Sequence, residues 1–232
     1  MRTALVPLAA LALGACDVYK AAPGPIEHFQ KSVDLDKSEM ARVQLKMGAG
    51  KMIVEGGSAK LMEGDFAYDI PSWKPTVRYN ATGFRGELLI EQPTGAKSTN
   101  NIAYEWNIKL NDKLPVELSA DLGAGEAHLN LGSMNLRSVK VEMGVGEVNL
   151  DLRGNPTHDF AVDIQGGVGH AEVHLPPSVG IDATAEGGIG HIETRGLENR
   201  DGHWVNAAHE HSPVTIHVKV QGGIGHIALI AE

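Results

Sequence analysis

Apolar and polar residues alternate along most of the chain after residue 33, and a Gly-x-Gly motif interrupts the alternation at intervals. In the stretch EVNLDL, the apolar Val148, Leu150 and Leu152 share one face of an extended chain, and the polar neighbours share the other. A period of two predicts half-buried β-strands on both sides of each motif. No segment has the 3.6-residue period of an amphipathic helix, so the pattern predicts an all-β protein.

The Gly-x-Gly motif recurs at spacings that indicate a structural repeat. The copies are Gly48-Ala49-Gly50, Gly123-Ala124-Gly125, Gly144-Val145-Gly146, Gly167-Val168-Gly169, Gly188-Ile189-Gly190 and Gly223-Ile224-Gly225. The second glycines of the last five copies are 21, 23, 21 and 35 residues apart. The shorter spacings are typical of β-solenoid coils, and the longer one contains an insertion, residues 196–212, that is expected to loop out. We therefore predict a single-domain, β-solenoid-like stack of short strands over residues 33–232, with about 21–23 residues per coil.

The glycines themselves predict corners and not a nucleotide site. A phosphate-binding glycine loop leads from a strand into a helix, whereas each copy here leads into another strand and lacks the remaining residues of those fingerprints. Glycine suits a corner where a β-carbon would collide with the adjacent coil or where φ is positive. The middle Ala, Val or Ile is expected to form an apolar plug beneath each corner.

The first sixteen residues, MRTALVPLAALALGAC, resemble a bacterial lipoprotein signal. A basic Arg2 precedes a short apolar stretch, and the segment ends in the lipobox-like Leu13-Gly14-Ala15-Cys16. We expect cleavage after residue 15, lipidation of Cys16 and a tether over residues 16–32, so that the protein is anchored to the membrane by lipid and does not span it. The alternative is an ordinary secretory signal with a cysteine near its cleavage point. Cys16 is the only cysteine, which excludes an intrachain disulfide.

Charge narrows the range of partners. The formal net charge is −9, and loss of the signal with its one charged residue, Arg2, makes it −10. Nucleic acids and anionic lipid headgroups are therefore poor partners for the folded domain. No nucleic-acid partner is expected.

Several runs of sequence resemble the toast-rack domain family. They are LKMGAGKMIVEGGSAKLMEGDFAYDI, GELLIEQ, WNIKLNDKLPVELSADLGAGEAHLNL and VKVEMGVGEVNLDL, and the similarity extends over roughly residues 33–232. The family comprises repetitive β-solenoid-like domains of bacterial envelope proteins, including the C-terminal part of LiaF-like regulators and proteins named as "putative adhesins". The resemblance implies protein contacts, in the best-understood members with envelope-stress sensor kinases, and it brings no catalytic residues. LiaF-like proteins carry an N-terminal membrane bundle where this chain has a lipobox.

Histidines are the candidate metal ligands. The chain has eleven, and His170, His191 and His226 each follow a Gly-x-Gly directly. Stacked coils would place them in a column, where they could bind a divalent metal or repel one another when protonated near pH 6. The alternative is a polar ladder on an exposed face. A second histidine group lies in and beyond the insertion, at His203, His209, His211 and His217.

No arrangement of residues predicts catalysis. The serines lie in unrelated turns or strands, and nothing in the sequence places a histidine and a carboxylate beside one of them. We expect no enzyme activity and no cofactor.

The C-terminal run GGIGHIALIAE predicts an interaction edge. Ala228 and Ile230 occupy positions that are polar in other coils, so the last coil would be apolar on both faces. An uncapped final coil offers an edge for a protein partner or for self-association. The alternative is that the tether or the insertion, with Trp204, covers this edge.

These features predict a lipid-anchored protein of the bacterial cell envelope, facing the periplasm or the exterior. Its expected role is that of a non-catalytic protein–protein interaction module in envelope stress sensing or regulation. The alternatives are an adhesin-like or structural surface scaffold and, third, a metal or pH sensor that uses the histidine column.

Overall fold

The computed structural model describes residues 24–93 and 103–232, so the signal segment, Cys16 and the start of the tether lie outside the described residues. The described chain is a single sheet of thirteen strands with one short 3-10 turn, η1 (Pro71–Trp73). No helix in this part of the chain is long and apolar enough to cross a membrane. The strands are β1 (Glu27–Val33), β2 (Met40–Ser58), β3 (Met62–Tyr68), β4 (Thr76–Thr82), β5 (Arg85–Glu91), β6 (Tyr104–Asn111), β7 (Val116–Asn130), β8 (Leu136–Asp151), β9 (Phe160–Leu175), β10 (Gly180–Arg195), β11 (Glu198–Arg200), β12 (His203–Val205) and β13 (Thr215–Ala231).

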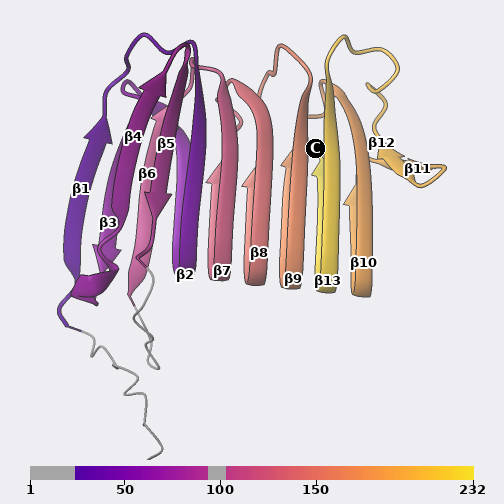
Figure 1. Cartoon of the computed structure of the whole chain (residues 1–232). Coiled ribbons are helices and arrows are strands. Elements are labelled where there is room, and N and C mark those ends of the chain that lie inside the picture. Colours follow the sequence, from indigo (N-terminus) through magenta and orange to yellow (C-terminus); the bar gives the residue numbers. More distant parts are fainter. Residues whose placement is uncertain (1–23, 94–102) are drawn as a thin grey trace, which may run out of the picture.

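Six long strands, β2, β7, β8, β9, β13 and β10, form the body of the molecule. Each contains one Gly-x-Gly motif, bends there and returns, so that it has a first arm before the motif and a second arm after it (Figure 1). Neighbouring long strands are parallel and in register through the bends. The all-β, repeating architecture predicted from the alternation is confirmed.

Apolar side chains from both arms form one core. On β8, for example, Val141 and Met143 before the bend and Val148 and Leu150 after it are all buried. They belong to the same cluster as the corresponding residues of the neighbouring strands. The faces predicted from the period-two alternation are therefore the faces that pack.

The sequence leaves open the path of the chain between residues 57 and 118. The strands of this region extend the sheet beside each arm of β2 separately. β5 pairs with the first arm of β2 and carries β4, whereas β6 pairs with the second arm and carries β3 and then β1. Aromatic residues fill the space in this part of the core. Trp106 is fully buried, with its ring centroid 5.7 Å from that of Phe66 and 5.9 Å from that of Tyr104.

The strand order differs from the predicted sequential stack. β13 lies between β9 and β10, with both sides paired in parallel. The predicted interaction edge at Ala228 and Ile230 is therefore wrong: Ala228 is 4% exposed and lies between Glu172 and Glu193 of the two neighbouring strands. Apolar residues on this face of β13 are explained by burial between two strands.

The end of the stack is β10, and the insertion covers only part of it. β12 pairs with Asp182 and Ala183 of β10, and β11 pairs with β12. The second arm of β10 has no strand beyond it among the described residues. At the other end, residues 27–32, assigned to the tether from the sequence, belong to β1, so the domain begins before residue 33.

Candidate functional site

The bends carry a row of exposed apolar side chains. In spatial order the middle residues of the motifs are Ala49, Ala124, Val145, Val168, Ile224 and Ile189, each paired with the next across the sheet. The last four are 54%, 46%, 51% and 72% exposed. The prediction that these residues are buried plugs is wrong, because the middle residue of a sharp bend projects away from the enclosed side. We refer to Val145, Val168, Ile224 and Ile189 as the bend ridge.

Contact between adjacent strands at the bend requires glycine. Gly146 has φ +141°, and a β-carbon there would lie 1.9 Å from the carbonyl oxygen of Gly125 on the neighbouring strand. No side chain fits so close to a backbone oxygen, so the predicted reason for the corner glycines is confirmed.

A cavity lies behind the ridge in the last three strands of the stack. The inward position before the bend is filled by Met47, Leu122 and Met143 on β2, β7 and β8, but the in-register residues of β9, β13 and β10 are Gly166, Gly222 and Gly187. The missing side chains leave a space of about 210 Å³ between the arms. Its apolar walls include Met143, Val148, Ile164, Val220, Ile192 and Ile227. We refer to it as the end cavity.

Three histidines border the end cavity in a row, His170, His226 and His191. The ring centroids of His170 and His226 are 4.9 Å apart, and those of His191 and His226 are 5.5 Å apart. The structure therefore brings the three predicted histidines together, with His226 in the middle because β13 is inserted. They form a row, however, and no group of three or more metal-ligating side chains in the described chain is arranged to hold a metal ion.

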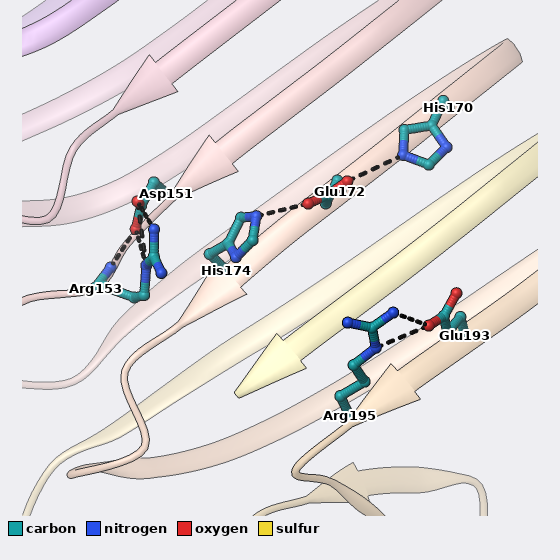
Figure 2. A network of polar contacts seen from close by, with 7 residues as sticks. All are labelled: Asp151, Arg153, His170, Glu172, His174, Glu193 and Arg195. Atoms are coloured by element: carbon teal, nitrogen blue, oxygen red, sulfur yellow. Dashed lines mark hydrogen bonds and ion pairs between the residues drawn. The ribbon is translucent and has the colours of Figure 1, made fainter. Parts of the chain in front are cut away.

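Carboxylates contact two histidines of this row along the second arms, and Figure 2 shows the contact on β9. Glu172 lies between His170 and His174 on β9, with N–O distances of 3.4 and 2.7 Å. On β10, Glu193 contacts Arg195 at 2.8 Å and lies 3.6 Å from Nε2 of His226. That buried nitrogen has no hydrogen-bond partner in the described chain, whereas both carboxylates do.

On β7 and β8, acidic residues lie next to the bend on both the first and the second arm. Asp121 lies opposite Glu142 before the bend, and Glu126 lies opposite Glu147 after it. Burial raises the pKa of Asp121, and the nearby Glu142 raises it further. These acidic pairs lie on β7 and β8, so they flank the bend ridge at its β8 end, beside Val145.

Comparison with known protein families identifies the fold. The family model described as the N-terminal domain of toast_rack, DUF2154, matches residues 22–174. The chain belongs to the toast-rack family. The residues of β8 and β9 that line the end cavity of this toast-rack protein lie within the matched residues, whereas those of β13 and β10 lie beyond them.

Solved structures resemble this chain to different degrees, and the first of those named here has the same fold. A "putative cell adhesion protein" from Clostridium sporogenes is 36% identical, with a TM-score of 0.85 over 89% of this toast-rack chain and 100% of that protein. A "putative adhesin" from Bacteroides fragilis is 11% identical, with a TM-score of 0.36 over 89% and 98% of the two chains. A "putative lipid binding protein" from Parabacteroides distasonis is 9% identical, with a TM-score of 0.30 over 91% and 99%. No curated protein matches the sequence.

The histidines of the second predicted group do not all contact the same carboxylate in the toast-rack structure. Nδ1 of His203 lies 2.6 Å from Oδ1 of Asp182, and Nδ1 of His217 lies 3.6 Å from Oδ2. Burial acts to raise the pKa of Asp182, but the hydrogen bond with His203 and the attraction of His203, His217 and His209 together outweigh it, and the pKa is lowered. His211 is exposed and does not share this carboxylate. The contact fastens the insertion to β10.

Sequence reasoning missed the end cavity and the exposure of the ridge. The signal for the cavity is present: the runs QGGVG, EGGIG and QGGIG have an additional glycine where DLGAG and EMGVG have an apolar side chain. Counting the alternation through the bend would have assigned that glycine to the core face. The exposure of the ridge had no comparable signal, since an apolar residue in a turn is ordinarily buried.

The toast-rack chain is expected to lose less stability in acid when Glu172 is replaced with glutamine. The hydrogen bond with His170 lowers the pKa of Glu172 below its ordinary value of 4.5, burial opposes this, and His174 lowers it further. A depressed pKa stabilises the fold above the unfolded-state value, and this stabilisation is lost as the pH falls through the folded-state value. Because the site is partly solvated, the contribution is about 1 kcal/mol or less.

The measurement is urea denaturation at about pH 5.5 and about pH 3, a range over which carboxylates titrate. Glu172→Gln should reduce the difference in unfolding free energy between the two pH values. Glu198→Gln, at an exposed carboxylate of β11, is the matched control and should leave that difference unchanged. Equal acid sensitivity of Glu172→Gln and the unmodified chain would show that this carboxylate does not stabilise the fold.

Proposed function

We propose that this protein is a non-catalytic, adhesin-like binding module of the bacterial cell envelope, anchored through a lipid on Cys16, and that it contacts a protein partner through the bend ridge. The observation that carries the proposal is the continuous row of four exposed apolar side chains. Adjacent strands lie about 4.8 Å apart, so these side chains form one surface and not scattered exposures. The name of the Clostridium sporogenes relative supports a binding role.

The acidic pairs at the β8 end of the ridge indicate the chemistry of the partner. Like charges directly opposite one another on neighbouring strands repel, and Asp121–Glu142 and Glu126–Glu147 are two such pairs. Lys51 lies 3.8 Å from Glu126 and Lys140 pairs with Glu142, so part of this repulsion is already relieved. A partner with basic residues around apolar anchors would relieve more of it, and its association would be faster at low salt.

The position of the ridge is compatible with an anchored protein. The described chain begins beside β1, at one end of the stack, whereas Ile224 and Ile189 lie at the opposite end (Figure 1). Residues 17–23 can reach at most about 25 Å from a lipidated Cys16. A tether at the β1 end would therefore leave the β10 end accessible to partners.

The identity of the partner distinguishes adhesion from regulation. An abundant membrane sensor protein would indicate a role in envelope stress sensing, and a component of another cell or of the matrix would indicate adhesion. In-cell photo-crosslinking from position 145, where the ridge residue Val145 is exposed, followed by mass spectrometry, makes this distinction. Residue 84 supplies a matched position, because Phe84 is 59% exposed but lies far from the bends in the turn between β4 and β5.

Replacing Ile189 and Ile224 together with aspartate is expected to reduce recovery of the crosslinked partner at least about tenfold, because each change places a charge in a desolvated contact. Both residues are exposed, so the unfolding free energy should change by only about 0.5 kcal/mol. Phe84→Asp should leave recovery unchanged. Undiminished recovery with the double variant would exclude the ridge as the contact surface.

A further inference from the structure

We propose that the end cavity receives one apolar ring, an aromatic side chain of the protein partner that docks on the bend ridge. The inference rests on the proposed function, because the ridge supplies the surrounding contact. Val168 and Ile224 belong both to the ridge and to the lining of the cavity. Ile189 of the ridge belongs to β10, whose second arm has no strand beyond it among the described residues, so a partner seated on that end of the ridge lies beside the open side of the cavity.

Neither the backbone conformation nor the space available requires glycine at the three positions that open the cavity. None of Gly166, Gly222 and Gly187 has a positive φ. A β-carbon on Gly187 would meet nothing within 4 Å, and one on Gly166 would have its nearest neighbour at 4.0 Å. The corner glycines differ, since a β-carbon at Gly223 would lie 2.4 Å from a backbone oxygen.

The other strands show that the same position normally holds a large side chain. Met143 of β8 is 7% exposed and lies in register with Gly166, and Leu122 of β7 is 3% exposed. Glycine occupies this core-facing position on three adjacent strands. Each glycine lacks the apolar burial that a larger side chain would contribute, at about 0.8 kcal/mol for each methylene. Ile227 recovers part of the space on β13, where it lies 3.3 Å from a β-carbon placed on Gly222.

The size and lining of the cavity define its occupant. An apolar cavity of about 150 Å³ holds a molecule of benzene, so about 210 Å³ has room for one substituted six-membered ring. The walls at Ile164, Val220 and Ile227 are aliphatic and buried. The imidazoles of His170 and His226 border the cavity and offer edge or face contacts to an aromatic ring.

A side chain of a protein partner fits this setting better than a free hydrophobic molecule. Aromatic side chains that insert into a pocket at the centre of an interface are the usual source of binding energy. The acidic pairs Asp121–Glu142 and Glu126–Glu147 near the ridge match basic neighbours of such an anchor. We therefore expect a partner segment that carries an aromatic residue flanked by lysine or arginine.

The first experiment uses indole as the probe on the mature chain. Titration with indole, monitored by methyl NMR, is expected to shift the signals of Ile164, Val220 and Ile227, which line the cavity. Gly166→Leu should fill the space and weaken indole binding at least about tenfold while leaving the unfolding midpoint unchanged or higher. Ala161→Leu, which adds the same side chain at an exposed position of β9, should leave indole binding unchanged.

The second experiment repeats the photo-crosslinking from position 145 with Gly166→Leu. Loss of the partner without loss of stability supports the inference. Absence of indole shifts, or equal shifts in the filled variant, overturns it. If Gly166→Leu retains the partner but the double variant Ile189→Asp and Ile224→Asp loses it, the cavity inference fails while the proposed function stands. If sedimentation shows a dimer of this chain that Gly166→Leu dissociates, the occupant is a second copy and the partner assignment is overturned.

Discussion

Gly225→Ala is expected to lower the free energy of unfolding by about 3 kcal/mol or more, which is the largest effect we foresee for so small a change. Gly225 has φ +145°, a conformation that residues with a β-carbon rarely adopt. The added carbon would lie 1.7 Å from the carbonyl oxygen of Gly169 on β9. Relief of the clash would separate β13 from β9 and disturb the parallel pairing on both sides of the bend.

Urea denaturation followed by circular dichroism measures this effect. Gly187→Ala is the matched control, because it adds the same carbon at a glycine with open space and no positive φ. It should change the unfolding free energy by no more than about 0.5 kcal/mol. Similar losses for the two variants would mean that the bend can move apart at little cost and that the close stacking of glycines is not what holds the strands.

Trp106→Ala should cost about 3–5 kcal/mol, because it removes the largest fully buried side chain of the aromatic core. The indole ring packs edge-to-face on Phe66 and Tyr104, so its loss leaves a cavity in the core beside β3 and β6. A lowered denaturation midpoint with an unchanged dependence on urea concentration would identify the effect as loss of packing in a fold that stays intact.

Trp106→Phe separates packing from polarity at the same position. The indole Nε1 is buried and has no hydrogen-bond partner in the described chain, so the native residue already bears a desolvation cost. Phenylalanine removes that group and restores part of the volume. Its loss of stability should therefore be clearly smaller than that of alanine, and an equal loss would argue against close packing around the indole.

The sequence predicts the bends and the buried faces because both depend on local rules. Glycine at a positive φ and the period-two alternation are properties of short segments, and Val148 and Leu150 are buried as expected. The exposure of Val168 and Ile189 was not predicted, because it depends on the direction of the bend relative to the core.

Strand order could not be predicted for a different reason. The runs QGGVGHAEV of β9, EGGIGHIET of β10 and QGGIGHIAL of β13 have almost the same pattern, so each can pair in register with either of the others. Which one takes the middle position depends on connections and on burial from both sides. The apolar Ala228, where the neighbours have Glu172 and Glu193, is the residue that marks the middle strand.

The insertion of β13 between β9 and β10 affects the order in which the chain can assemble as it is synthesised. The parallel strands from β7 to β9 can each dock on a neighbour that precedes them in the chain. β10 cannot, because its parallel partner, residues 215–231, follows it in the chain. β10 therefore joins the stack only when β13 is available, and until then the open side of β9 is the exposed growing face of the protein.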